Sequence, residues 1–304
     1  MTSPAATTST PTTGRPRGPF GMAYARIQVP DVEASASWYE YHVGLARAGT
    51  HGDTAFMRFG RPHHCLELVP APGRKEAWTV ATGFTVESSA VLQSLHERIS
   101  AAGCQTGPVD AGVKGLCREG FAVTDPNGFV IELLVGFEEF AVAPDVEMAP
   151  IDIVHPFLST DRFDESLEFY TRVLGFLPSD HIVGSTSFLR SENRYHHSMA
   201  LRRDSKFFVA HVCFLMANFD DMMRRRARAL YKKVELPADM MNHSASGSIA
   251  TYLYDSRHGP RIELCDGHVV FDTVLHETHE PRRMSLDPRN IDIWRPAPDD
   301  WSGF

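Results

Sequence analysis

Three short apolar runs in the second half of the chain each carry one polar residue that a core strand would ordinarily lack. The runs span residues 151–158, 207–214 and 259–265, and each has the length and the β-branched or aromatic content of a single strand. Their unusual polar residues are, in chain order, His155, His211 and Glu263. Two imidazoles and one carboxylate form the ligand set of a facial triad, which leaves the opposite metal positions open. Taken singly, each residue has a plainer interpretation as a hydrogen-bonded strand residue.

Strand-like and helix-like patterns alternate in the first half of the chain, from about residue 20 to residue 136. Apolar residues at helical spacing predict one helix that begins at Asp31 and stops at Gly44, and a second that is closed by Gly103. The predicted strands cover residues 23–29, 54–60, 63–69, 81–87, 120–125 and 129–135. The pattern indicates a strand–helix–three-strand unit that occurs twice.

The second half repeats this order after a linker near residues 138–149. The double histidine that ends at His64 returns at His197, an offset of 133 residues, and Glu132 returns as Glu263, an offset of 131 residues. Because the two offsets differ by only two residues, duplication explains them better than coincidence. We therefore predict an α+β fold in which four such units form two homologous domains.

The predicted organisation has four parts. They are a disordered tail at residues 1–19, an N-terminal domain without a metal site at 20–137, a C-terminal catalytic domain at 150–270, and a C-terminal arm at 271–304. The tail is rich in Ser, Thr, Pro and Gly and has little to bury. The arm lacks periodicity, and we expect Trp294 and Trp301 to anchor it to the domain surface, at a subunit contact.

The repeat provides an internal control for the metal-type residues. With this offset His155 aligns with Tyr24 and His211 with about Thr82, whereas the glutamate is kept in both halves. One carboxylate alone cannot hold a transition metal with useful affinity, and a structural requirement of the fold would have kept the histidines in both copies. The comparison favours a metal site in the second half only, with the first domain as a catalytically silent scaffold.

Composition and charge exclude several other classes of protein. The 304-residue chain carries a formal net charge of −8 and has a pI near 6.0, and its basic run at residues 224–226 indicates a solvated helix face, not a nucleic-acid site. No apolar run is long enough to span a membrane, and no signal peptide is recognised. The five cysteines form no CxxC pair and are odd in number, which predicts reduced thiols in a cytoplasmic protein.

With these residues the second half resembles the type I extradiol ring-cleavage (catechol) dioxygenases of the vicinal-oxygen-chelate (glyoxalase/bleomycin-resistance) superfamily. The resemblance covers roughly residues 20–270, and it implies paired βαβββ modules whose mixed sheets curl around a central cavity. It implies that His155, His211 and Glu263 bind Fe(II), or alternatively Mn(II). It also implies a homo-oligomer that uses O2 to open a catechol-type aromatic ring beside the diol, in aromatic compound degradation.

Three further residues match motifs of that family. An H-x-x-A-L run places an active-site histidine at His197, and a histidine nine residues before a tyrosine is matched by His243 and Tyr252. The gap from tyrosine to glutamate is eleven residues here instead of ten, because the turn at 255–260 replaces the family's D-P-x-G turn and holds one extra residue. Tyr254 is therefore the alternative to Tyr252.

The resemblance implies a role for each of these residues. His197 would be a general acid near bound oxygen, and His243 and Tyr252 would orient the substrate oxygen. We expect His196 to alternate to the other strand face as a packing or surface residue, and His258 to lie near the cavity mouth. The plainer alternatives are a loop histidine at position 243 and an ordinary core tyrosine at position 252.

A second function remains open at this point. The chain would then be a non-redox member of the same superfamily, either a metal-dependent isomerase or lyase, or a metal-free protein that binds a small molecule. The set of polar residues around the expected metal favours the dioxygenase, because those residues have no clear purpose without oxygen chemistry.

Overall fold

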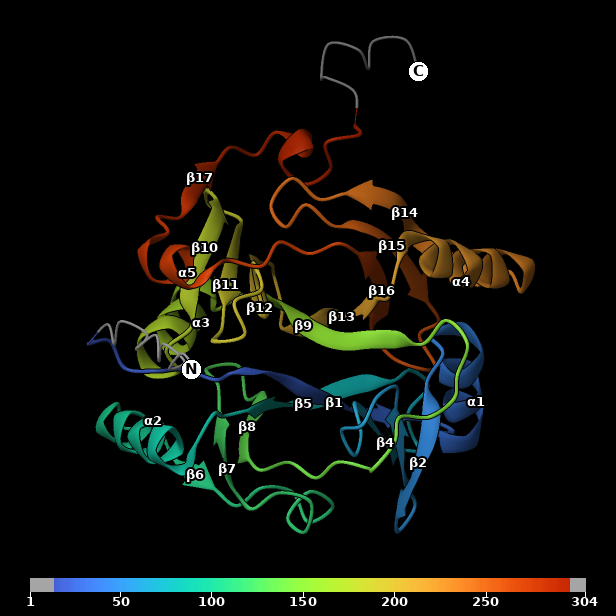
Figure 1. Ribbon diagram of the computed structural model, residues 1–304, viewed down its shortest axis with the longest axis horizontal. Helices are drawn as coiled ribbons and strands as arrows, with labels where there is room; N and C mark the ends of the chain where they lie inside the picture. The colour runs from blue at the N-terminus through green and yellow to red at the C-terminus, as the bar shows by residue number, and fades with distance from the viewer. Residues whose placement is uncertain (1–13, 296–304) are drawn as a thin grey trace, which may run out of the picture.

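In the computed structural model, which describes residues 14–295, each half of the chain folds into one mixed β-sheet flanked by helices (Figure 1). The first sheet contains β1 (Gly21–Val29), β2 (Ala46–His51), β3 (Thr54–Arg58), β4 (Leu66–Pro70), β5 (Trp78–Thr85), β6 (Thr106–Gly107), β7 (Glu119–Thr124) and β8 (Val130–Val135). The second contains β9 (Pro150–Thr160), β10 (Leu177–Ile182), β11 (Thr186–Arg190), β12 (Met199–Arg203), β13 (Phe208–Met216), β14 (Glu235–Asn242), β15 (Ile249–Tyr254), β16 (Arg261–Asp266) and β17 (Arg282–Met284).

The strand order repeats between the two sheets. The first sheet runs β2-β3-β4-β1-β5-β8-β7-β6, and the second runs β14-β15-β16-β13-β9-β12-β11-β10-β17. In each sheet, two modules meet where their first strands pair antiparallel, β1 with β5 and β9 with β13. Each first strand also pairs parallel with the last strand of its own module, for example β1 with β4 and β13 with β16. The two sheets therefore have the paired-module architecture that the duplication predicts.

The helices cover the outer sides of the sheets, and all of the described α-helices except α3 begin at a side-chain cap. They are α1 (Val32–His42), α2 (Ser89–Ala101), α3 (Phe163–Glu168) with the π-helical turn η1 (Phe169–Val173), α4 (Phe219–Tyr231), α5 (Thr273–Thr278) and the 3-10 turn η2 (Pro288–Asn290). Asp31 caps α1 by accepting a hydrogen bond from the backbone N–H of Ala34. Gly44 follows that helix with φ +87°, a backbone conformation that favours glycine over residues with a Cβ.

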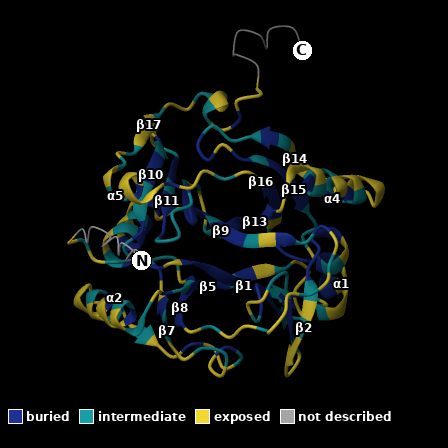
Figure 2. Cartoon of the chain, in the orientation of Figure 1, coloured by how far each residue is buried: buried dark blue, intermediate teal, exposed yellow. Residues whose placement is uncertain are grey.

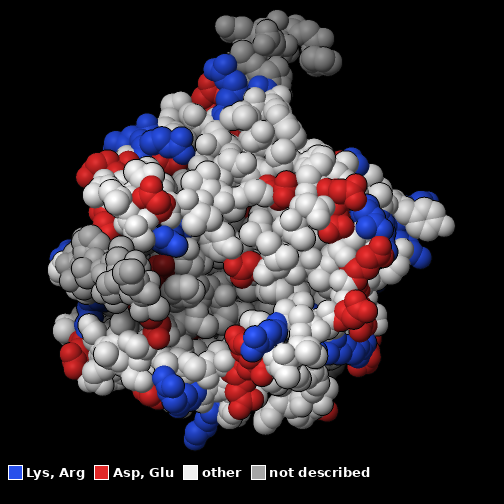
Figure 3. All heavy atoms as spheres, viewed as in Figure 1, with Lys and Arg blue, Asp and Glu red and all other residues white. Residues whose placement is uncertain are grey.

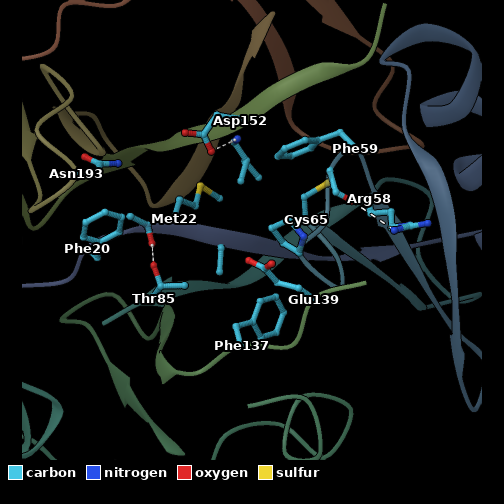
Figure 4. Close-up of a pocket in the computed structure, with 15 residues that line it drawn as sticks. Phe20, Met22, Arg58, Phe59, Cys65, Thr85, Phe137, Glu139, Asp152 and Asn193 are labelled. Carbon is cyan, nitrogen blue, oxygen red and sulfur yellow. Dashed lines mark hydrogen bonds between the residues drawn. The ribbon is translucent and has the colours of Figure 1, made fainter. Parts of the chain in front are cut away.

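The strands at the centre of each sheet are the most buried part of the molecule (Figure 2). The two sheets lie against each other through β1 and β9, and between them is a cavity of about 320 Å³ (Figure 4). Phe20, Met22 and Cys65 line it from the first half, and Asp152 and Asn193 line it from the second. Burial raises the pKa of Asp152 to about 6, against the lowering effect of hydrogen bonds from Tyr195 and the Ile153 N–H.

Arg225 contradicts the expectation that the basic run at residues 224–226 is a solvated face. Its side chain is almost fully buried, and its guanidinium donates to the carbonyls of Tyr41, Glu147 and Met148 at 2.8, 2.7 and 3.0 Å. These three backbone carbonyls have no partner in a strand, so the buried guanidinium of Arg225 satisfies them. The same contacts hold the linker between the halves to α1 and α4.

The terminal segments are more closely attached than the sequence suggests. Residues 1–13 of the predicted tail lie outside the described residues, but Arg15 pairs with Glu192 at 2.7 Å and with Glu277 at 2.7 Å. The prediction of a disordered tail is therefore wrong for its last residues, which oppositely charged side chains hold in place. In the arm, β17 adds a parallel strand beside β10.

Trp294 does not anchor the arm as predicted. Trp294 is 50% exposed, and Trp301 lies outside the described residues. Buried His276 and Asp292 attach this segment instead: Arg190 donates to the His276 carbonyl, and Asp292 accepts from the Asn242 N–H at 3.0 Å.

The surface in Figure 3 carries Lys and Arg interspersed with Asp and Glu, with no continuous basic stripe on that face. Within residues 14–295, every helix is too short or too polar to cross a membrane.

Candidate metal centre

Three neighbouring strands of the second sheet bring His155, His211 and Glu263 together. Cys213 on β13 is the cross-strand partner of His155 on β9 and of Glu263 on β16. Paired residues on adjacent strands project to the same face of a sheet, and His211 shares that face because it lies two residues before Cys213. Residues far apart in the sequence therefore converge from β9, β13 and β16.

The donor atoms of these residues form a tight triangle. His155 Nε2 lies 3.1 Å from His211 Nε2 and 3.4 Å from Glu263 Oε2, and His211 Nε2 lies 3.0 Å from Glu263 Oε2. Two ligand atoms that are each about 2.1 Å from one ion, and at right angles about it, are about 3 Å apart. The triangle and its nitrogen and oxygen donors therefore fit a single divalent transition metal.

The protonation of these groups suits metal binding. Burial alone would raise the pKa of Glu263, but the charge of His211 and hydrogen bonds from His155 and His211 hold this pKa well below its usual value. Burial lowers the pKa of His211 to about 4. An ionised carboxylate beside a neutral imidazole is the state in which these residues bind a metal.

His243 and Tyr252 lie next to this triangle. Tyr252 is the cross-strand partner of Glu263, and its hydroxyl lies 2.9 Å from His243 Nε2. His243 Nε2 is also 3.4 Å from Glu263 Oε1. Burial lowers the pKa of His243, but the hydrogen bond and the charge of the Glu263 carboxylate raise it. The net effect is a raised pKa. Tyr254, the alternative tyrosine, lies at the end of β15 and lines a separate depression beside Trp38, not the cavity at the triangle.

A cavity of about 320 Å³ opens onto the triangle. His155, His211, Glu263, His197, His243 and Tyr252 all line it. Phe157, Phe188 and Met241 supply apolar wall, which suits a flat aromatic ligand. The extra residue in the 255–260 turn has not displaced Tyr252 from this cavity.

His197 lies at the cavity, and its neighbour makes polar contacts that were not expected. The strand begins only at Met199, so strict alternation does not apply to the double histidine. His196 is buried, its Nδ1 lies 3.1 Å from His197 Nδ1, and its Nε2 lies 2.8 Å from Asp180 Oδ2. His196 is thus a buried residue that does not line the cavity, which fits the packing alternative, but its polar contacts with His197 and Asp180 were not predicted.

His258 is not placed as expected. Its Nδ1 lies 3.0 Å from the hydroxyl of Ser35, and its carbonyl accepts from the Tyr39 hydroxyl at 3.1 Å. The residue thus packs on α1 of the first half, and it does not line the cavity at the triangle. The longer turn at residues 255–260 therefore contributes to the contact between the two halves.

His268 received no role from the sequence, yet it lies close to the triangle. Its ring centroid is 4.9 Å from that of His197 and 6.1 Å from that of His155. Burial lowers its pKa to about 3, against the raising effect of a hydrogen bond with the His197 backbone. The one sequence feature that could have indicated this position of His268 is the preceding Gly267, whose φ of +67° lets the chain turn back after β16.

The corresponding position in the first sheet has a different arrangement. The Tyr24 hydroxyl donates to Glu132, Arg26 Nη2 donates to the same carboxylate oxygen at 2.9 Å, and the Asp110 N–H donates to the other at 2.6 Å. The residue at the position of His211 is Ala81 and not Thr82 as expected, because Gly83 pairs with Glu132 as Cys213 pairs with Glu263. No group of three metal-ligating side chains in the described part of this half lies close enough to hold an ion.

Comparison with known proteins identifies the repeated unit. The model of the Glyoxalase/Bleomycin resistance protein/Dioxygenase superfamily matches the chain twice, at residues 21–133 and 152–263. An "iron-dependent extradiol dioxygenase" from Rhodococcus jostii (strain RHA1) is 28% identical over 278 residues, which cover 83% of this chain and 90% of that protein.

Solved structures give the same fold. The Mn(II)-bound glyoxalase from Novosphingobium aromaticivorans has a TM-score of 0.79 at 23% identity, covering 93% of each chain. BphC, described as a halotolerant catechol dioxygenase, has a TM-score of 0.80 at 22% identity and covers 93% of this chain and 96% of its own. These likenesses confirm the predicted α+β fold of duplicated modules.

Proposed function

Because the chain belongs to the Glyoxalase/Bleomycin resistance protein/Dioxygenase superfamily, we propose that it is an extradiol dioxygenase of catechol-type aromatic diols. The observation that carries the proposal is the triangle of His155, His211 and Glu263, which opens onto a cavity that His197, His243 and Tyr252 also line. Its volume of about 320 Å³ lies at the lower end of the range of roughly 300–1,000 Å³ for ligand pockets.

His155, His211 and Glu263 would hold Fe(II), and the same ligand set would accept Mn(II). Such a metal would supply Lewis acidity, which favours the loss of a proton from a diol that chelates it, and a redox centre for the reaction with O2. Neutral imidazoles and a single carboxylate keep the net charge at the site low.

The remaining polar residues would orient the diol and move its protons. The hydrogen-bonded pair of His243 and Tyr252 would hold one substrate oxygen, since both residues lie beside Glu263. His197, at the cavity wall, would exchange a proton with the substrate and act as general acid during ring opening. Phe157 and Phe188 would shield the aromatic ring of the substrate from water.

The test is an oxygen-uptake assay on the full chain after anaerobic reconstitution with Fe(II). With a panel of catechols, we expect one diol to be consumed with an equivalent of O2, and label from ¹⁸O2 to appear at both new oxygens of a product opened beside the diol. Turnover that proceeds equally without O2 would favour the isomerase or lyase. Binding without metal or turnover would favour a sequestering protein.

A further inference from the structure

We propose that His196, Asp180 and Arg282 form a buried hydrogen-bond chain that fixes the tautomer of His197. In this tautomer the proton is on Nδ1, and the unprotonated Nε2 is left to the cavity. The inference rests on the proposed function where it concerns catalysis, but the tautomer itself is a property of the fold. His196, Asp180 and Arg282 are positioning residues in this account.

The chain of contacts is continuous. His197 Nδ1 lies 3.1 Å from His196 Nδ1, and His196 Nε2 lies 2.8 Å from Asp180 Oδ2. Arg282 then closes on Asp180: its backbone N–H and Nε donate to Oδ1 at 3.0 and 2.9 Å, and Nη2 donates to Oδ2. His196, His197 and Asp180 are all buried, with Asp180 at 0% exposure.

The direction of each hydrogen bond follows from the carboxylate. Against the raising effect of burial, hydrogen bonds from His196 and Arg282 lower the pKa of Asp180 to about 2, so this side chain is an acceptor only. His196 must therefore donate from Nε2. Burial lowers the pKa of His196, so its ring is neutral and its Nδ1 is an acceptor. The short contact to His197 Nδ1 is then satisfied only if His197 donates from Nδ1.

The first half contains the same histidine pair with the carboxylate at the opposite end. His63 Nδ1 lies 3.0 Å from His64 Nδ1, but it is His64 whose Nε2 bonds to a carboxylate, Glu67 Oε1, at 3.0 Å. His64 thus donates from Nε2, and for a neutral pair its Nδ1 accepts from His63. The duplicated pair carries inverted tautomers, because the acidic partner has moved from one ring to the other.

The tautomer decides what His197 does first. With a lone pair on Nε2, His197 would begin the reaction as a base. A hydroxyl O–H bond of the diol breaks, a new Nε2–H bond forms, and the resulting imidazolium keeps its Nδ1–H donated to His196. The same proton is then available from Nε2 when the ring opens, so His197 would serve as acid only after it has served as base.

The arm takes part in this arrangement. Arg282 comes from β17, the edge strand of the sheet, which pairs with β10, the strand that carries Asp180. The bidentate contact orients both carboxylate oxygens and keeps Oδ2 directed at His196. A segment beyond the two matched domains thereby contributes to the geometry of the site.

The decisive variant is Asp180→Asn. An amide at this position would keep its oxygen against the two Arg282 donors at the Oδ1 position and present its NH2 group to His196, and the third donor, Arg282 Nη2, would lose its acceptor. His196 would then accept at Nε2 and donate from Nδ1, which forces His197 onto the Nε2–H tautomer. In serine proteases the corresponding Asp-to-Asn change traps the wrong histidine tautomer and lowers kcat by about 10⁴.

The first readout is ¹⁵N NMR of the full chain labelled at histidine, in the metal-free state, with the His197 signals identified by their loss in His197→Phe. We expect an Nδ1–H tautomer in the parent and an Nε2–H tautomer in Asp180→Asn. His63→Phe, which changes the matching pair in the first half, should leave the His197 signals unchanged. An Nε2–H tautomer in the parent, or no change in Asp180→Asn, overturns the proposal.

The second readout is kinetic and concerns the iron-loaded chain. Asp180→Asn should lower kcat by about 10²–10⁴ while the iron content and the KM for the diol stay within a few-fold of the parent. If the tautomer inverts and kcat does not fall, the catalytic part of the inference is wrong. If the parent turns over no diol, the proposed function fails, and the NMR result still decides the tautomer.

Discussion

The two halves of the chain share one backbone plan and differ in what surrounds the same glutamate. In the first sheet Glu132 accepts hydrogen bonds from Tyr24 and Arg26, so a fixed cation already balances the buried carboxylate. In the second sheet Glu263 faces His155 and His211. The proposed metal centre therefore differs from the first-half position in the partners of a retained carboxylate, with the strands left in place.

A second difference lies in the side chains that line the corresponding cavity of each half. Arg26 and Glu67 are cross-strand partners in the first sheet and form a buried ion pair. The positions that correspond to them in the second sheet, again as cross-strand partners, are Phe157 and Ala200. In the first half Arg26 and Glu67 line a cavity of about 300 Å³, whereas in the second half Phe157 stands in place of that cation at a cavity of about 320 Å³. The exchange makes the second cavity more suitable for a flat ligand and a metal.

The largest effect on turnover, short of losing the metal, is expected from His197→Phe. General acid–base groups contribute about 10²–10⁴ in rate, so kcat should fall by that factor while the iron content is retained. The matched variant His64→Phe changes the equivalent ring in the first half and should leave kcat nearly unchanged. Steady-state kinetics with metal analysis on both proteins checks this, and equal losses in the two variants would contradict the asymmetry of the halves.

A smaller effect is expected from Tyr252→Phe. The change removes one hydroxyl that hydrogen-bonds to His243 and lies beside Glu263. Hydrogen bonds to charged groups are worth about 1.5–3 kcal/mol, which corresponds to roughly a tenfold to hundredfold loss in kcat/KM for the diol. Tyr24→Phe, at the corresponding position of the first half, should reduce stability but leave kcat/KM unchanged. A loss of turnover in Tyr24→Phe and not in Tyr252→Phe would reverse the assignment.

Glu132→Gln should affect turnover by no more than a few-fold, because the first half has a scaffold role. The variant weakens three buried hydrogen bonds to the carboxylate, so the free energy of unfolding should fall by about 1–3 kcal/mol. Denaturant unfolding and oxygen uptake on the same preparation separate the two quantities. Loss of activity in a protein that remains folded would show that the first half has a part in the chemistry.

The smallest effect concerns acid stability. The pKa of Asp180 is lowered to about 2 in the folded chain, so its contribution to stability is complete above its ordinary pKa and is lost as the pH falls toward 2. Because the pKa of Asp180 is nearly two units below its ordinary value, the ionised side chain contributes about 2 kcal/mol to the free energy of unfolding. Plots of unfolding free energy against pH for the parent and Asp180→Asn should therefore converge by about that amount between pH 4 and pH 2. Parallel plots would mean that Asp180 is not held as a low-pKa carboxylate.

Much of the fold was predictable because hydrophobic spacing and duplication are local or periodic signals. The pattern predicts α1 and α2 with their ends, and the strands that carry His155, His211 and Glu263. The short edge strands β2 and β6 were not predicted, since they bury few apolar side chains. Strand β17 was missed because its pairing with β10 spans about a hundred residues and leaves no pattern in its own three residues.

The site was predictable only where the family's motifs or the repeat mark a residue. The polar contacts of His196 were not predicted because they depend on Asp180 and Arg282, which neither adjoin it nor share a strand with it. His268 lies near His197 through the turn at Gly267, a geometry that spacing does not encode. Long-range polar partners of this kind are fixed by packing, whereas strand alternation describes only residues within one regular strand.

The measurement that tests the central claim most directly is the iron content of matched variants after anaerobic reconstitution, with folding followed by circular dichroism. The account predicts a full equivalent of iron for the parent and for Glu132→Gln. It predicts almost none for the folded variant in which His155, His211 and Glu263 are all replaced by alanine. A folded triple variant that keeps a full equivalent, or a loss of iron in Glu132→Gln, would contradict the assignment of the metal centre to the second half.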